Sequence, residues 1–166
     1  MLQPTVRRTW GPKGKTPIHK SWDRRDRLSV ISAITVSPKR RNLGLVFQIH
    51  RKNIHTDEAA AFFRAIRRKL GNRVVFVLDR YSVHRGAVKR LRQAGASWFD
   101  IEWLPPYAPE LNPDEQVWNH TKYSDLPNFI PDNINHLEHE LLQSLEKQSR
   151  DKKLLASHFV CAELKL

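Results

Sequence analysis

The acidic residues whose surroundings could support chemistry are Asp79, Asp114 and Glu115. Asp79 ends the run VVFVLD (residues 74–79), in which five apolar residues lead directly into an acid. Such a run predicts a central strand that is covered on both faces, with Asp79 at its carboxyl end, where open α/β sheets usually place ligands. An ordinary strand-ending or helix-capping aspartate has the same signature, and the residues alone leave both interpretations open.

Asp114 and Glu115 follow an unusual number of prolines in LPPYAPELNPDEQVW (residues 104–118). Pro113 suits the first turn of a helix, and Asn112 is then the expected N-cap. Acids in a first turn also complement the helix dipole without any other role. This interaction with the helix dipole does not explain the upstream prolines. We expect those prolines to fix the direction in which the side chain of Glu115 points. A carboxylate that binds Mg²⁺ needs such preset geometry, because Mg²⁺ tolerates little deviation from octahedral ligation.

Apolar spacing predicts the elements that would position these acids. The segments predicted as strands are 27–37, 43–50, 74–79 and 101–105, and the first two suggest a hairpin. Helices are predicted from Thr56 to Gly71, over about 85–94, from about Asn112 into the low 120s, and within 133–159. The resulting order of elements predicts a mixed sheet flanked by helices, in one domain over residues 1–166. We expect Trp118 and a leucine stripe over 134–145 to lie in the core, with a dimer face as the alternative for the stripe.

Basic residues are concentrated near the N-terminus of this chain of 166 residues and net charge +12. Residues 1–55 hold 13 Lys and Arg but only two acids, whereas residues 56–166 hold 16 Lys and Arg and 15 acids. This asymmetry favours a nucleic-acid partner over a merely soluble basic face, because phosphate contacts supply much of such affinity. Cys161 is the only cysteine, which excludes an internal disulfide and a cysteine-based zinc cluster. No signal peptide or membrane-length apolar run is present, so we expect a cytoplasmic protein.

Two strings carry a family resemblance: VLDRYSVHRG, and then LPPYAPELNPDEQVWNHTKY. Together with RRTWGPKGKTP (7–17) and RLSVISAITVSP (27–38), they resemble the DDE transposases of bacterial insertion sequences related to the mariner superfamily. The resemblance covers essentially the whole chain. It assigns Asp79 and Glu115 as the second and third acids of the catalytic triad, separated by 35 residues. Asp114 occupies a position that is often apolar in the family, so we interpret it as a helix-turn acid rather than a ligand.

The resemblance implies a ribonuclease H-like fold in which three carboxylates bind two divalent ions, Mg²⁺ or Mn²⁺. Two metals can stabilise both the attacking and the leaving oxygen when a DNA strand is cut or transferred. His84, five residues beyond Asp79, could orient a phosphate or a carboxylate, or it could simply start the following helix. DNA contacts are expected in the basic first part of the chain, at Arg7, Arg8, Lys13, Lys15, Arg24 and Arg25. Trp10 is expected to pack rather than bind DNA, and a homodimer is an open alternative.

The first acid of the triad has no counterpart in this sequence. In the family it precedes the RRTW string, but only MLQPTV precedes Arg7 here, and Asp23 and Asp26 follow the string. We therefore expect a fold that lacks all or part of its first core strand and has no upstream helix-turn-helix region. The chain would be a decayed fragment, the product of a misassigned start codon, or one half of a frameshifted pair. It would have little transposase activity alone. The competing interpretation is a non-catalytic, basic nucleic-acid-binding domain of the same fold.

Overall fold

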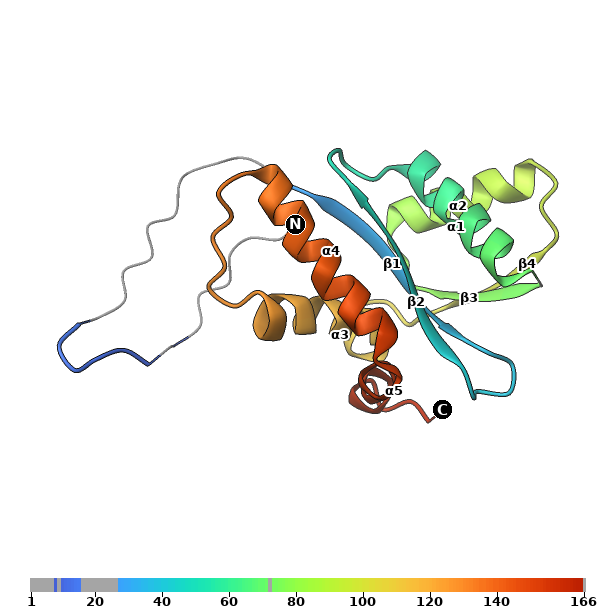
Figure 1. Ribbon diagram of the computed structural model, residues 1–166. Coiled ribbons are helices and arrows are strands. Elements are labelled where there is room, and N and C mark those ends of the chain that lie inside the picture. The colour runs from blue at the N-terminus through green and yellow to red at the C-terminus, as the bar shows by residue number, and fades with distance from the viewer. Residues whose placement is uncertain (1–7, 9, 16–26, 72, 166) are drawn as a thin grey trace.

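The computed structural model describes residues 8, 10–15, 27–71 and 73–165. Its strands are β1 (Ser29–Val36), β2 (Leu43–His50), β3 (Val74–Leu78) and β4 (Phe99–Trp103). Its α-helices are α1 (Thr56–Leu70), α2 (Ser82–Gln93), α3 (Pro113–His120), α4 (Ile134–Arg150) and α5 (Lys152–Cys161). A 3-10 turn, η1 (Pro109–Leu111), precedes α3, and a π-helical segment, η2 (Thr121–Asp125), continues it. Figure 1 shows these elements along the chain.

The strands form two separate pairs within the described part of the chain. β1 and β2 pair antiparallel over their whole length, from Ser29 opposite His50 to Val36 opposite Leu43. β3 and β4 pair in parallel, with Val74 opposite Phe99 and Leu78 opposite Trp103. The predicted hairpin and the predicted strand order are confirmed. The single mixed sheet is not observed, because β1 and β3 belong to different two-stranded sheets.

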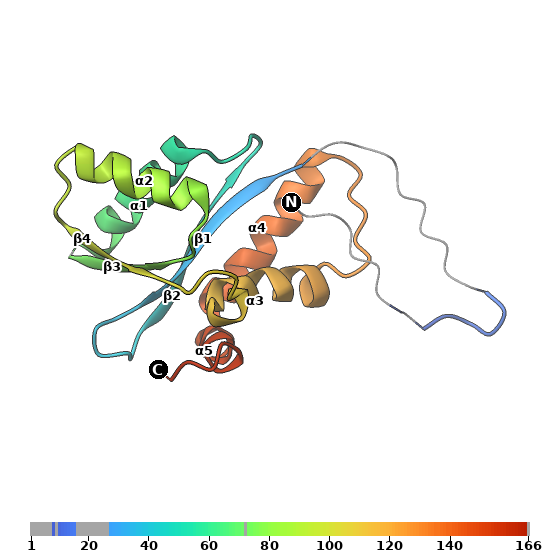
Figure 2. The ribbon, with the colours of Figure 1, turned by 180° about the vertical axis from the view of Figure 1, so that it is seen from behind.

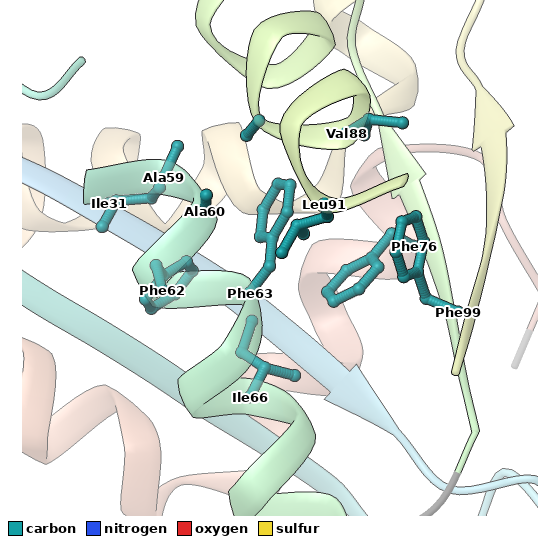
Figure 3. Close-up of a cluster of buried hydrophobic side chains, with 11 residues drawn as sticks. Ile31, Ala59, Ala60, Phe62, Phe63, Ile66, Phe76, Val88, Leu91 and Phe99 are labelled. Carbon is teal, nitrogen blue, oxygen red and sulfur yellow. The ribbon is translucent and has the colours of Figure 1, made fainter. Parts of the chain in front are cut away.

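Helices α1 and α2 cover one side of both strand pairs (Figures 1 and 2). Their shared core contains Phe63 of α1, Phe76 of β3 and Leu91 of α2, and the rings of Phe63 and Phe76 stack with centroids 4.7 Å apart. Figure 3 shows that Ile31 of β1 reaches the same cluster. One apolar cluster thus holds both strand pairs beneath the same two helices.

The opposite face of β1 and β2 packs against α3, α4 and α5. Leu43 and Leu45 of β2 meet Val117 of α3 and the predicted leucine stripe of α4, whose buried members are Leu137, Leu141 and Leu145. Half-buried Trp118 packs against this cluster, so the core prediction for the stripe and for Trp118 is confirmed. The exception is Leu142, which is 39% exposed.

The far side of β3 is open, which contradicts the prediction of a strand covered on both faces. Phe76 is buried, but its neighbours Val75 and Val77 are 59% and 60% exposed. Side chains alternate across a strand, so these two valines point away from α1 and α2. Within the described part of the chain, the helices of the other layer pack on β1 and β2 rather than on this face of β3. The run VVFVL is therefore apolar on both faces but covered on only one.

Candidate functional site

Asp79 is the first residue beyond β3, as predicted, and its side chain is 44% exposed. Its Oδ1 accepts hydrogen bonds from the backbone N–H of Tyr81 (3.0 Å) and from Nδ1 of His84 (2.6 Å). An ionised carboxylate can only accept, so in this contact Nδ1 of His84 is the donor. The strand end and the first turn of α2 therefore hold Asp79 in a defined orientation.

His84 lies in the first turn of α2, where aromatic neighbours restrain its ring. The ring centroid of Phe63 is 6.3 Å away, and that of Tyr81 is 5.8 Å away with the two rings edge to face. The sequence left two roles open for His84, orienting a functional group or starting a helix. The structure places it in the helix start and in contact with Asp79, so the two roles are compatible.

The proline-rich segment connects the end of β4 to the start of α3. The backbone N–H of Leu104 still bonds the carbonyl of Leu78 at 2.8 Å, which ties the segment to the end of β3. Tyr107 then adopts a positive φ of 58°, which is uncommon for an aromatic residue, and its side chain is fully exposed. Asn112 caps α3 as predicted, accepting from the N–H of Asp114 at 3.1 Å. Asp114 and Glu115 accordingly stand in the first turn of α3.

Asp114 is turned toward the interior of the molecule. Its Oδ2 accepts a hydrogen bond from the hydroxyl of Ser32 on β1 at 2.6 Å, and its Oδ1 is also buried. Burial raises the pKa of Asp114 to about 6, and the charges of Glu115 and Asp79 add to the rise, whereas hydrogen bonds from the side chains of Ser32 and Trp118 act in the opposite direction. Three acids therefore share one electrostatic environment. The sequence predicted Asp114 only as a helix-turn acid, and its inward orientation was not predicted.

Comparison with known proteins identifies the family. A family model described as "DDE superfamily endonuclease" matches residues 1–137. The chain belongs to the DDE superfamily endonucleases. A solved structure, "Crystal structure of the Mos1 Strand Transfer Complex", matches with a TM-score of 0.56 and 12% sequence identity over 98% of this chain. At that identity the likeness shows the fold, and the expected ribonuclease H-like architecture is confirmed. This chain covers 50% of the matched Mos1 chain, and comparison with curated proteins gave no match.

DDE endonucleases generally use divalent metals, and Asp79 and Glu115 supply the carboxylate oxygens that such ions prefer. Within the described part of the chain, however, no group of three or more His, Cys, Asp or Glu side chains is arranged to hold a metal ion. The described residues before β1 include no acid at all. The described residues therefore do not complete the three-carboxylate centre that the family resemblance implies.

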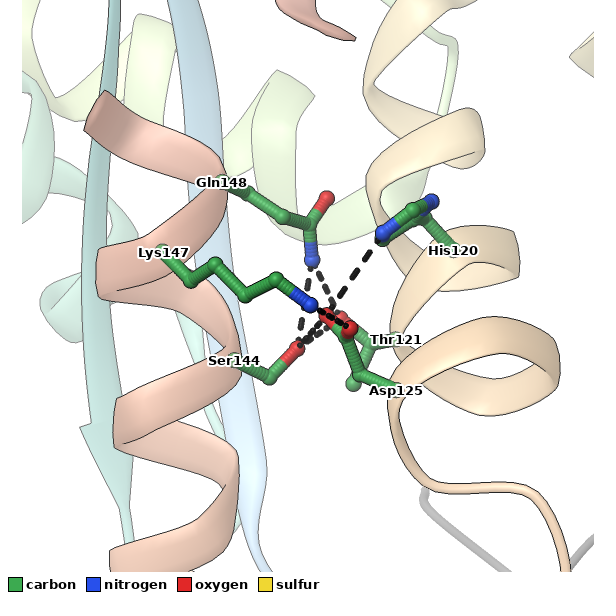
Figure 4. A network of polar contacts seen from close by, with 6 residues as sticks. All are labelled: His120, Thr121, Asp125, Ser144, Lys147 and Gln148. Carbon is green, nitrogen blue, oxygen red and sulfur yellow. Dashed lines mark hydrogen bonds and ion pairs between the residues drawn. The ribbon is translucent and has the colours of Figure 1, made fainter. Parts of the chain in front are cut away.

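A polar network fixes the far end of the helix that carries Glu115. Figure 4 shows side chains of η2 meeting side chains of α4. Gln148, which is buried, donates from Nε2 to Oγ1 of Thr121 at 2.8 Å. Asp125 accepts from the hydroxyl of Ser144 at 2.9 Å and from Nζ of Lys147 at 2.6 Å. In this DDE endonuclease chain, α3 is thus held by Asn112 at one end and by this network at the other.

The predicted DNA-binding residues fall partly within the described structure. Arg8, Lys13 and Lys15 are exposed, and Arg7, Arg24 and Arg25 lie outside the described residues. The prediction that Trp10 packs is wrong, because its side chain is fully exposed. A solvent-facing tryptophan between cations is typical of surfaces that stack nucleobases.

A second group of cations lies on α2 and was not assigned to DNA from the sequence. Arg85, Lys89 and Arg92 are all exposed on this helix. The spacing i, i+4, i+7 places them on one helical face, and that spacing was the signal available in the sequence. It was overlooked because the net charge of the chain is concentrated before residue 56.

Proposed function

We propose that this chain is the catalytic domain of a transposase-type DDE endonuclease that binds DNA and contributes Asp79 and Glu115 to its reaction centre. The observation that carries the proposal is the shared environment of Asp79 and of the acids in the first turn of α3, with Asp79 oriented by His84. Membership of the DDE superfamily endonucleases supports the reaction class. The fold likeness to a strand transfer complex supports DNA as the partner.

The roles of the chain's own residues follow from their chemistry. Asp79 and Glu115 would hold the divalent ions that, when bound, supply electrophilic stabilisation of phosphate oxygens. His84 would keep the Asp79 carboxylate aligned through Nδ1, as groups hydrogen-bonded to ligating side chains do elsewhere. The exposed cations Arg8, Lys13 and Lys15 would neutralise DNA phosphates.

The described residues offer no counterpart of the first acid of the centre. We propose that the described residues supply only the second and third acids of the centre, and that the isolated chain binds DNA but cuts it poorly. This agrees with the two separate strand pairs, which leave one edge of β1 and one edge of β3 without a strand partner in the described structure. Residues 1–166 would form one domain, since α1 and α2 share a core with both strand pairs.

Cellular location and assembly are also proposals. Within the described residues no helix has both the length and the apolar character needed to cross a bilayer. We propose that the protein acts at DNA in the cytoplasm of a bacterium. A homodimer is compatible with this function, but the leucine stripe that was its alternative interface is largely buried in the core.

The deciding experiment measures duplex binding and nicking together. The purified chain is incubated with duplex DNA carrying the terminal inverted repeats, with Mg²⁺ or Mn²⁺, beside the variants Asp79→Ala and Glu115→Gln. We expect salt-dependent duplex binding by all three proteins and little nicking by any. Robust nicking by the natural chain that Asp79→Ala abolishes would show that its centre is complete.

The second candidate is a non-catalytic nucleic-acid-binding domain, and the incomplete acid centre favours it. A thermal shift with Mn²⁺ separates the two functions. If Asp79 and Glu115 bind metal, Mn²⁺ raises the Tm of the natural chain and does not raise that of the double variant Asp79→Asn/Glu115→Gln. If the acids are structural, Mn²⁺ has no effect on either protein and the substitutions change only the Tm in its absence.

A further inference from the structure

A basic hollow lies between α2 and the carboxyl ends of β3 and β4. Its volume is about 420 Å³, which is within the range of small-ligand sites. Arg85, Lys89 and Arg92 of α2 line it, together with Arg80 and Trp103. None of the residues that line it is acidic.

The secondary structure explains why these side chains converge. Arg85, Val88, Lys89 and Arg92 recur on one face of α2, and Val88 anchors that face because it is buried in the core. Trp103 lies on the same side of β4 as Phe99 and Ile101, the side that packs toward α1 and α2. It is half-buried, so the core holds part of the indole while another part borders the hollow. The aromatic group is therefore part of the wall rather than a loose surface side chain.

The cations of the hollow lack the carboxylate partners found elsewhere on the same helix. Arg90, on a different face of α2, pairs with Asp57 at 2.5 Å. Within the described part of the chain, neither Arg85, Lys89 nor Arg92 has a carboxylate oxygen within ion-pair distance. Arg92 does lie in the field of Asp100, but that carboxylate is already bound by Arg73 through two hydrogen bonds, of 2.7 and 2.9 Å.

Such an arrangement favours a bound anion. Like charges four residues apart on a helix repel one another, so Arg85 and Lys89 destabilise α2 unless a negative group lies between them. Arg80 adds a further cation from the end of β3, where its Nε–H also reaches the carbonyl of Leu104 at 3.4 Å. Guanidinium groups bind phosphate oxygens in a bidentate manner, which suits a phosphodiester better than a lone carboxylate.

We propose that this hollow binds a segment of single-stranded DNA, with its phosphates on Arg85, Lys89 and Arg92 and one base against Trp103. A concave site with an aromatic wall fits an unpaired base, because a base inside a duplex has both faces covered by its neighbours. Arg80 directly follows Asp79, so a strand in the hollow leads toward the acids. The inference rests on the proposed DNA-binding function and adds that part of the bound DNA is single-stranded.

The test compares two double charge reversals with the same change in net charge. Arg85→Glu/Lys89→Glu alters the hollow. Arg64→Glu/Arg68→Glu alters an exposed i, i+4 pair on α1 that does not line the hollow. Fluorescence anisotropy measures Kd of the full chain for a labelled oligo(dT) of about 12 nucleotides, within the site size of single-strand binders, and for a blunt duplex. Thermal melts of each variant establish that it folds.

We expect the hollow variant to bind oligo(dT) at least about tenfold more weakly, while the α1 variant changes by less than about threefold. The slope of log K against log salt for oligo(dT) should become shallower by about 1 to 2, since each lost phosphate contact removes about 0.7. Equal losses for the two variants would mean that overall charge governs binding, which overturns the proposal. An equal loss on the duplex and on oligo(dT) overturns the preference for a single strand.

Trp103 tests the base contact separately. Trp103→Phe keeps an aromatic face and should retain most of the affinity for oligo(dT), whereas Trp103→Leu should weaken it by about tenfold, in keeping with one stacked base. If Trp103→Leu does not fold, a dT oligomer and an abasic oligomer of equal length are compared on the natural chain. Equal affinity for the two oligomers overturns stacking. Failure to bind any duplex would contradict the proposed function itself, whereas normal duplex binding without an effect of the hollow contradicts only this inference.

Discussion

At this site, Asp114 is the acid whose surroundings most clearly disfavour the ionised carboxylate. One of its carboxyl oxygens accepts a hydrogen bond from Ser32, and the other is buried. Its pKa rises from 3.8 to about 6, first through burial and then through the charges of Glu115 and Asp79. Ionised Asp114 therefore lowers the stability of the fold.

The raised pKa has a definite sign in the pH dependence of stability. Because the folded carboxyl group binds its proton more tightly than the unfolded one, ionisation destabilises the fold by about 3 kcal/mol above about pH 6. This penalty disappears as pH falls from about 6 to about 4. We predict that Asp114→Asn raises the free energy of unfolding by about 2 kcal/mol at about pH 8 and has little effect near pH 4.

Urea denaturation of both proteins across this pH range provides the measurement. Glu110→Gln is the matched control, since Glu110 is an exposed acid in the same segment and its removal should leave the pH profile unchanged. A stability gain for Asp114→Asn that is the same at both ends of the range would show that the carboxyl group is not the cause.

At the scale of elements, the position of Glu115 depends on how α3 is held. Beyond His120 the helix continues as the π-helical segment η2, which directs Thr121 and Asp125 toward α4. Thr121 is fully buried, and its hydroxyl oxygen lies 2.8 Å from Nε2 of Gln148 and 3.2 Å from Oγ of Ser144. Unsatisfied buried donors are costly, so this hydroxyl should stabilise the packing of α3 on α4.

We predict that Thr121→Val lowers the free energy of unfolding by about 1–3 kcal/mol, because it keeps the side-chain shape but removes the acceptor for Gln148. Ser124→Ala removes a hydroxyl from an exposed position of the same segment and should cost less than about 0.5 kcal/mol. Chemical denaturation of the two variants gives the comparison. Equal, small effects would mean that the network does not hold α3.

The elements themselves were predictable where the local pattern was complete. α1 begins at Thr56 and ends before Gly71, which adopts the left-handed conformation of a helix end. The apolar spacing over 133–159 did not reveal that Asp151 ends α4 and caps α5, accepting from the N–H of Leu154. A single polar residue that caps a new helix leaves the surrounding apolar period nearly unchanged, so periodicity alone does not detect the break.

The candidate site was predictable in part, for a different reason. Asp79 and Glu115 could be selected because strand ends and helix starts are visible in the sequence. The inward orientation of the Asp114 side chain could not be predicted, because it depends on Ser32 of β1, which is 82 residues away in the sequence. The basic hollow depends likewise on β4 lying beside α2. Contacts between distant segments are set by tertiary packing, which a single sequence does not display.

At the scale of the whole molecule, the two strand pairs are covered unequally. Within the described structure, helices pack on both sides of β1 and β2, whereas β3 and β4 are covered only by α1 and α2. Val75 and Val77 consequently form an exposed apolar strip on β3, opposite Asp100 and Glu102 of β4. The strip is bare in the described structure, so its valines should contribute little to the stability of the isolated chain.

We predict that Val75→Thr/Val77→Thr changes the free energy of unfolding by less than about 1 kcal/mol in total, because threonine keeps the branched shape and the valines are mostly in water. Phe76→Ala, between them but buried, should cost about 3–5 kcal/mol. Denaturation at two protein concentrations measures both effects. A loss above about 2 kcal/mol for the double variant would mean that another segment or another copy covers this face, because only a buried valine makes the added hydroxyl so costly.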